Sequence, residues 1–427
     1  MLNKTDVINK INNGEFDDVL KYLYVTEGVE AQRARYLSLL AGYEENFGDL
    51  GEVSLFSAPG RTEIGGNHTD HQHGCVLAGS VNLDVIAAVS SNGENVVRIK
   101  SKGYPMDEIL LDDLDVKEAE FGKSVSIIRG IIKKVTDLGY KVEGFNAYTE
   151  SNVLQGSGLS SSAAFEVLVG TILSHLFADN KIDAVEIAKI GQFAENVYYN
   201  KPCGLLDQMA SSVGAVVAID FKDNSAPVVN RVDFDLSGYG HSLCIIDSGA
   251  DHADLTDEYA AVPSEMRAVA NFFEKDFLRD VEKSEFYAKL KEVRAAVKND
   301  RAVLRAIHFF NESDRAVDET EAVKNGDFAE FCRLSRKSGQ SSYMYLQNVY
   351  AASKPAMQAV SLALAMCDEI LGDKGAFRVH GGGFAGTIQA IVPNEMVADF
   401  KAKIEAVFGE GMCHILSIRP TGGYRLV

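Results

Sequence analysis

The chain lacks several features that mark common classes of protein. It has 427 residues but only six cysteines, and no two of them form a C-x-x-C pair. This usage is typical of reduced, mostly buried thiols rather than of a disulfide framework or a zinc site. No apolar run approaches membrane-spanning length, and the first residues resemble no secretory signal. We therefore expect a cytoplasmic protein without a membrane partner.

Basic residues are also in short supply. The sequence has 42 Lys and Arg against 61 Asp and Glu, which gives a formal net charge of −19. A protein with this excess of negative charge is a poor partner for nucleic acid. An anionic substrate would need a local site rich in N–H groups or basic side chains, often with a divalent cation.

The common nucleotide loop, G-x-x-x-x-G-K-[ST], is absent, but residues 155–164 contain another glycine-rich loop. Gly156 and Gly158 permit close approach of backbone to a ligand, and three serines at 160–162 precede an apolar, helix-forming run to residue 178. Such a loop would present unpaired N–H groups and the positive end of a helix dipole to an anion. The alternative is a turn that caps an ordinary helix.

Length and patterning predict two domains with grouped rather than alternating strands and helices. An apolar content of 46% is ample for two cores. We predict an α+β fold with a helical N-terminal extension at 1–48, a domain at 49–225 and a second domain at 226–427, because the polar segment 222–227 resembles a linker. A strand at 53–57 is expected to end at Ala58-Pro59-Gly60.

Residues 60–74 are dense in side chains that hydrogen-bond to hydroxyl groups, which favours a site for a sugar-like polyol. His68, His71 and His73 also form an H-x-x-H-x-H pattern that could bind a transition metal. A solvated turn without a role is the third interpretation.

Two carboxylates flank a turn farther along the chain. Asp207 lies among apolar residues, so it is either a base or the N-cap of a helix, because a buried carboxylate is costly unless it is paired or used. Glu195 lies on a predicted helix, where a solvated position is the default. Three glycines at 381–383 permit close approach of a ligand or a neighbouring strand, although such a run is more often a turn than a phosphate contact.

In this order and spacing, the segments resemble the GHMP family of small-molecule kinases, and the galactokinases within it. The resemblance spans roughly residues 50 to 427 and rests on segments at 57–61, 68–70, 156–164, 202–208, 257–259 and 379–386. It implies a two-domain GHMP kinase fold, with an N-terminal domain like domain 2 of ribosomal protein S5 and a ferredoxin-like C-terminal domain.

The resemblance also implies a role for each matching residue. Asp207 would accept the proton of the anomeric hydroxyl, and Arg61 would keep that aspartate ionised. Ser162 and Glu195 would hold Mg²⁺. The triphosphate of ATP would be bound by Gly156, Ser157, Gly158, Leu159, Ser160, Ser161 and Ser162. The sugar would be bound by Asn67, His68, Thr69, Asp70 and Tyr259.

One departure from the family pattern falls in the sugar segment. Asn67 stands where the family has a glutamate that contacts the sugar. An amide in place of a carboxylate changes which hydroxyl groups or substituents are tolerated. The resemblance thus implies an ATP-dependent galactokinase that makes galactose 1-phosphate. The alternatives are a 1-kinase for a related sugar, such as a galactose derivative, and a galactokinase-like sensor that binds sugar and ATP without turnover.

Overall fold

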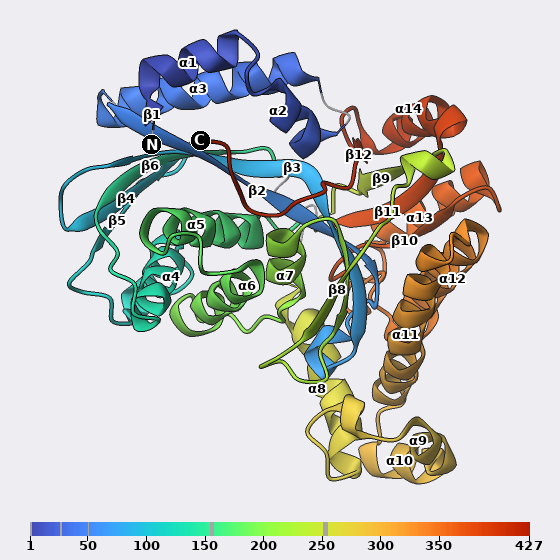
Figure 1. The fold of residues 1–427 in the computed structure, drawn as a ribbon. Helices are drawn as coiled ribbons and strands as arrows, with labels where there is room; N and C mark the ends of the chain where they lie inside the picture. The colour runs from blue at the N-terminus through green and yellow to red at the C-terminus, as the bar shows by residue number, and fades with distance from the viewer. Residues whose placement is uncertain (1, 26–27, 50, 154–157, 251–254) are drawn as a thin grey trace.

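Two sheets organise the chain in the computed structural model (Figure 1), which describes residues 2–25, 28–49, 51–153, 158–250 and 255–427. Nine strands of the described chain form the large sheet, in the order β1-β2-β3-β6-β4-β5, with β7 beside β3, β8 beside β7 and β13 beside β2. Their bounds are β1 Leu2–Asn3, β2 Glu52–Gly65, β3 Cys75–Ser91, β4 Val96–Ser101, β5 Met106–Leu110, β6 Phe145–Ser151, β7 Val216–Asp220, β8 Val228–Val232 and β13 Tyr424–Arg425.

Helices cover both faces of the large sheet. On one face lie α1 Lys4–Asn12, α2 Asp17–Tyr24 and α3 Val29–Phe47; on the other lie α4 Ser124–Asp137, α5 Ser161–Phe177, α6 Ala184–Phe193 and α7 Leu206–Val213 (Figure 1). Successive strand residues alternate between the two cores: Ile86 and Ala88 pack with the first helices, whereas Val85 and Ala87 pack with the second. The strands therefore consist of nearly continuous apolar runs, because both of their faces are buried.

The small sheet has the order β10-β11-β9-β12, with bounds β9 His241–Asp247, β10 Ala376–Val379, β11 Thr387–Pro393 and β12 Cys413–Leu416. Helices α8 Thr256–Phe272, α9 Lys283–Ala288, α10 Leu290–Val297, α11 Asp300–Lys324, α12 Phe328–Ser341 and α13 Ala359–Leu371 connect β9 to β10, and α14 Val397–Phe408 connects β11 to β12. This is the strand and helix order of a ferredoxin-like unit. The predicted α+β class is confirmed.

Strand β2 is longer than the sequence predicts. It was expected to end at Ala58-Pro59-Gly60, but it continues to Gly65. The pairing of β2 with β3 shifts register between Pro59 and Arg61. Proline lacks an N–H donor and is tolerated in a sheet at such a bulge, so the Pro-Gly pair interrupts the ladder without ending the strand.

The polar segment 222–227 is the turn of a hairpin between β7 and β8. Asp223 accepts hydrogen bonds from the backbone N and the hydroxyl of Ser225, which is the bonding of an Asx turn. The boundary expected between residues 225 and 226 lies inside this hairpin, so β8 stays with the large sheet. The change to the small sheet comes between β8 and β9.

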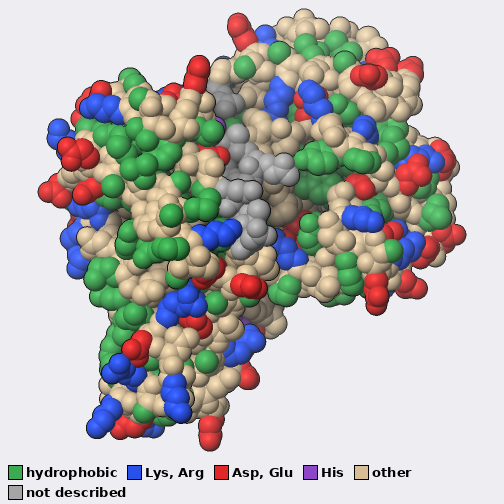
Figure 2. All heavy atoms as spheres, turned by 180° about the vertical axis from the view of Figure 1, so that it is seen from behind, with side chains coloured by type: hydrophobic (Ala, Val, Ile, Leu, Met, Phe, Trp, Pro, Cys, Tyr) green, Lys and Arg blue, Asp and Glu red, His purple; other side chains and the backbone are tan. Residues whose placement is uncertain are grey.

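Acidic and basic side chains are interspersed over the rear face of the molecule (Figure 2). None of the helices that the structure describes has the length and apolarity to span a bilayer.

Candidate active site

A cavity of about 220 Å³ lies where the large sheet meets the small one. Its walls come from the end of β2, the turn after β2, the start of α7 and the glycine turn after β10, through residues Arg61, Glu63, His68, Asp70, Leu206, Asp207, Gly381 and Gly382. Pockets for drug-sized ligands usually measure about 300–1,000 Å³, so this cavity suits a smaller, polar molecule.

Arg61 and Asp207 form the central contact of the cavity. Arg61 donates from Nε to Asp207 Oδ1 at 2.7 Å, and its Nη2 forms an ion pair with the same oxygen at 2.6 Å. Ser160 Oγ donates to Asp207 Oδ2 at 2.7 Å. Both oxygens of Asp207 are therefore oriented by donors, although its side chain stays 36% exposed. Leu205 is the N-cap residue of α7 and makes no side-chain cap bond, so the structure does not support the N-cap interpretation of Asp207.

The glycine loop approaches the same contact. Gly156 and Ser157 lie outside the described residues. Arg61 binds the next part of the loop, donating from Nη1 to the carbonyl of Gly158 and from its backbone N to Leu159 O at 2.9 Å. Gly158 has φ +69°, and a Cβ there would lie 2.9 Å from His380 Nδ1. The position therefore requires glycine.

The three serines at the start of α5 have different surroundings. Ser160 is the N-cap residue in the left-handed region, with φ 55°, and its hydroxyl donates to Asp207. Helix α5 begins at Ser161. Ser162 is exposed, and its hydroxyl bonds to none of the described residues. Ser162 is thus open to a ligand at a helix N-terminus.

Glu195 lies in a π-helical turn, Ala194–Tyr198, and is buried. Its Oε1 pairs with Lys201 Nζ at 2.9 Å, and its Oε2 accepts from Gln208 Nε2 at 2.9 Å. Gln208 Nε2 also donates to Glu166 Oε2 at 2.9 Å. Burial, and next the charge of Glu195, raise the pKa of Glu166 well above its usual range.

The chemistry of these groups fits Mg²⁺. Ser162 offers a hydroxyl, Glu195 and Glu166 offer carboxyl oxygens, and Glu166 Oε1 is buried without a hydrogen bond among the described residues. Mg²⁺ prefers oxygen ligands and usually binds one or two carboxylates together with waters and phosphates. Glu166 comes four residues after Ser162 and so lies on the same face of α5. This spacing is the sequence signal from which Glu166 could have been predicted as a site residue.

The three histidines of the sugar segment do not converge. The rings of His68 and His71 are 5.6 Å apart, and His73 stacks on Phe277 at 3.8 Å. Within the described part of the chain, no group of three or more His, Cys, Asp or Glu side chains is arranged to hold a metal ion. The structure gives no support to the transition-metal interpretation.

His68 and Asp70 face the cavity. His68 Nε2 donates to Gly382 O at 3.0 Å, and burial lowers the pKa of this imidazole, so a neutral ring fixes the glycine turn. Burial, and then the charges of Asp207 and Glu63, raise the pKa of Asp70 to about 7. Asp70 therefore titrates in the physiological range.

Two other predicted sugar residues have structural partners and do not line the cavity. Thr69 is buried, and its hydroxyl donates to Gly66 O and Cys75 O, both at 2.8 Å. The Tyr259 hydroxyl donates to Gly383 O at 2.7 Å. The ring of Tyr259 lies against Gly382, where a Cβ would be 2.6 Å from Cε1. Both residues shape the turns around the cavity.

Asn67 also points away from the cavity, which differs from its predicted contact with the sugar. The side chain is 0% exposed. Its Nδ2 donates to Glu63 Oε1 at 2.8 Å and to Gly381 O at 2.7 Å. Its Oδ1 accepts from Ser342 Oγ at 3.1 Å and Asn348 Nδ2 at 2.9 Å. The amide therefore has protein partners for both of its donor hydrogens and for its oxygen.

Comparison with known proteins places this geometry in a family. The model of the GHMP kinase N-terminal domain matches residues 126–215, and the galactokinase galactose-binding signature matches residues 41–91. The chain therefore contains the N-terminal domain of the GHMP kinases. The galactose-binding signature is that of an enzyme of the galactokinase type.

Solved structures share the fold. A Lactococcus lactis galactokinase complexed with galactose has a TM-score of 0.78 at 23% identity, covering 91% of this chain and 99% of its own. The mevalonate kinase of Methanococcus jannaschii has a TM-score of 0.61 at 13% identity, covering 86% and 99%. A D-glycero-D-manno-heptose 1-phosphate kinase from Bacteriodes thetaiotaomicron has a TM-score of 0.57 at 14% identity, covering 88% and 98%.

A larger cavity, of about 530 Å³, lies at the far end of α5, and none of the predicted site residues lines it. Among the charged and polar side chains that line the smaller cavity, Glu63 is the one that was not predicted as a site residue. Arg61 and Glu63 are two apart in β2 and thus lie on the same face of that strand. Strand alternation is the signal that points to Glu63, and it applies only if β2 continues beyond Gly60.

Proposed function

We propose that the protein is an ATP-dependent galactokinase, which transfers the γ-phosphoryl group of ATP to the anomeric hydroxyl of galactose. The observation that carries the proposal is the contact of Arg61 with Asp207 at the wall of a sugar-sized cavity, beside the glycine loop. The galactose-binding signature at residues 41–91 supports galactose as the sugar. The galactokinase that shares this fold was crystallised with galactose.

In this mechanism Asp207 is the base. Its carboxylate accepts the proton of the anomeric hydroxyl, the sugar oxygen bonds to the γ-phosphorus, and the bond from that phosphorus to the bridging oxygen breaks, releasing ADP. Arg61 and Ser160 hold the two carboxylate oxygens, so the base is oriented before the sugar binds. The product is galactose 1-phosphate.

The proposal includes Mg²⁺ as the metal ion and the cytosol as the compartment. Ser162 and Glu195 would hold Mg²⁺, which neutralises charge on the phosphates when bound. Lys201 Nζ lies 2.9 Å from Glu195 Oε1 and supplies a positive charge beside that carboxylate. All six cysteines are unpaired, which supports a reducing compartment such as the cytosol.

A related hexose is the second candidate substrate. It is favoured by one observation: Asn67 is turned inward, and Glu63 lies at the cavity wall instead. A sugar in this cavity would contact the carboxylate of Glu63. That contact, which the sequence analysis did not predict, would favour some hexoses over others.

The test is a coupled assay of ADP release with Mg²⁺, ATP and a panel of hexoses, with ³¹P NMR of the product. We expect galactose or a close derivative to stimulate ADP release and to give a phosphate on the anomeric carbon. If no monosaccharide stimulates ADP release, or if the phosphate lies on another carbon, the proposal is wrong.

A further inference from the structure

We infer that Glu63 is a specificity-determining residue of the sugar site, and that it accepts a hydrogen bond from one donor substituent of the bound hexose. The inference rests on the proposed function, since it takes the occupant of the cavity to be a sugar. It goes further in naming the residue and the chemistry of the substituent. The favoured substituent is a hydroxyl or an ammonium group, both of which can donate.

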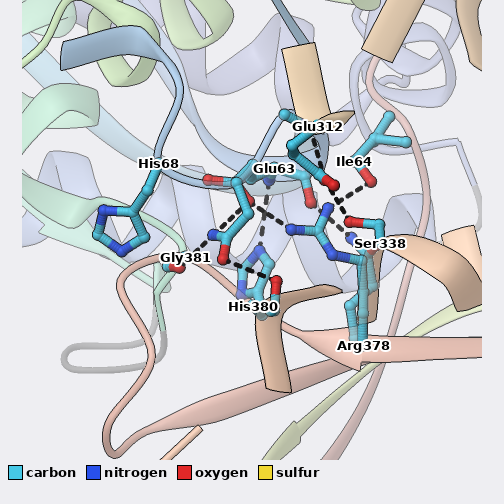
Figure 3. A network of polar contacts seen from close by, with 12 residues as sticks. Glu63, Ile64, His68, Glu312, Ser338, Arg378, His380 and Gly381 are labelled. Atoms are coloured by element: carbon cyan, nitrogen blue, oxygen red, sulfur yellow. Dashed lines mark hydrogen bonds and ion pairs between the residues drawn. The ribbon is translucent and has the colours of Figure 1, made fainter. Parts of the chain in front are cut away.

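The two oxygens of Glu63 have different surroundings. Oε1 accepts from Arg378 Nη2 at 2.7 Å (Figure 3). It also accepts from Asn67 Nδ2 at 2.8 Å. Oε2 accepts no hydrogen bond from any residue that the structure describes, and it is not among the fully buried polar atoms that lack a partner. Because Glu63 is 7% exposed and lines the cavity, the open oxygen has the cavity as its outlet.

Arg378 fixes the charge and the direction of this carboxylate. Its side chain is 0% exposed and comes from β10 of the small sheet. Besides the bond to Glu63, Nη1 donates to Ile64 O at 2.6 Å. A buried charge needs a partner, so Glu63 and Arg378 hold each other in one geometry. A carboxylate held in this way is preorganised for a ligand.

Asn67 provides the second restraint. Its amide is oriented by Ser342, Asn348 and the carbonyl of Gly381, and it then donates to Glu63. Asn67 thus acts on the sugar through Glu63, as a positioning residue. The inward direction of Asn67 and the outward oxygen of Glu63 belong to one arrangement.

The chemistry of an ionised carboxylate limits the substituent that faces it. The carboxylate only accepts hydrogen bonds, so a hydroxyl is favoured, whereas hydrogen and fluorine cannot donate. A hydrogen bond to a charged group contributes enough that its loss lowers affinity by about 10- to 150-fold. At other carbons of the sugar, fluorine can still accept a hydrogen bond from the protein. A fluoro analogue there should keep part of the affinity that the deoxy analogue loses.

The experiment measures sugar binding by calorimetry for the wild type and Glu63→Gln, with galactose and its deoxy and fluoro analogues at each non-anomeric carbon. In Glu63→Gln the amide oxygen can keep the bonds to Arg378 and Asn67, while the NH₂ group replaces the open oxygen. We expect galactose affinity to fall by about 10- to 150-fold. At one carbon only, the wild type and variant should bind the deoxy analogue equally.

Glu319→Gln is the matched control. Glu319 is a buried glutamate of the neighbouring network that does not line the cavity, and neither of its carboxyl oxygens has a hydrogen bond among the described residues. We expect Glu319→Gln to bind every analogue as the wild type does. A general disturbance of the network would instead weaken binding in both variants.

The outcomes separate the two claims. If Glu63→Gln lowers the affinity for every analogue by the same factor, or lowers none of the affinities, the inference is wrong, whatever the turnover assay gives. If sugar binds with the expected pattern but ADP is not released, the proposed function fails and the inference stands. Should Glu63→Gln not fold, the wild type alone decides: one carbon must show equal losses for deoxy and fluoro analogues, and the absence of such a carbon overturns the inference.

Discussion

Two of the aspartates that pair with arginine, Asp84 and Asp207, have very different surroundings. Asp84, on β3, is 0% exposed and is bound by Arg35 of α3, by Arg419 and by Tyr24 of α2. Asp207, on α7, is bound by Arg61 and Ser160, yet 36% of its side chain is exposed. The same chemical pair therefore joins structural elements in one place and faces a cavity in the other.

The difference lies in what completes each carboxylate. Burial opposes ionisation of Asp84, but the charges of Arg35 and Arg419 outweigh it and lower the pKa of Asp84. Every polar neighbour of this group belongs to the protein. The donors on Asp207 fix its orientation and leave part of it accessible to a ligand. Pairing with arginine thus indicates a functional aspartate only when an open surface accompanies it.

The largest expected effect is on turnover. Asp207→Asn keeps the shape of the side chain but removes the base, so we expect kcat to fall by about 10²- to 10⁴-fold. Because the group is partly exposed, the melting temperature should change little, and sugar binding should persist. Steady-state kinetics, calorimetry and thermal unfolding measure the three quantities. A kcat within tenfold of wild type would remove Asp207 from the role of base.

The next effect is on stability. Asp84→Asn leaves Arg35 and Arg419 without their shared charge partner, and breaking such a buried pair costs about 3–5 kcal/mol. Urea unfolding measures the loss, while kcat of the folded enzyme should stay near wild type. The control is Asp17→Asn, which breaks a partly exposed pair with Arg33 and should lower stability far less, because solvent screens that pair. Equal losses in the two variants would contradict the contrast.

A third variant tests the metal side of the cavity. Glu195→Gln weakens a hard oxygen ligand, so we expect the Mg²⁺ concentration for half-maximal activity to rise by ~10-fold or more. Magnesium titrations at saturating sugar and ATP measure this change. The sugar KM should remain near wild type. An unchanged magnesium requirement would show that Glu195 serves the structure alone.

The smallest effect concerns pH. In the folded protein the pKa of Asp70 is about 7, above its ordinary value of 3.8, so the folded state retains a proton that the unfolded state loses. The contribution of Asp70 to the free energy of unfolding is therefore fully present below pH 3.8. It is lost as the pH rises through about 7. We expect Asp70→Asn to raise the melting temperature relative to wild type more at pH 8 than at pH 4.5. An equal difference at the two values would contradict the raised pKa.

Much of the architecture can be predicted from sequence because hydrophobic patterning and glycine positions are local signals. These signals locate the glycine loop before Ser162, whereas the roles predicted for Arg61, Ser162, Glu195 and Asp207 come from the resemblance to the GHMP kinases. Which atoms of a segment face a ligand is decided by partners far along the chain. Asn67 is turned inward by Ser342 and Asn348, about 275 and 281 residues away. No local pattern around Asn67 carries that information.

Arg419 is separated from Asp84 by 335 residues, and it completes the group that joins the first helices to the large sheet. During synthesis the aspartate is made long before this arginine. Until then it would be buried with part of its charge uncompensated. The N-terminal half is therefore not expected to reach its final state on the ribosome as an independent unit, and the order of translation postpones completion of the enzyme until the distant arginine has emerged.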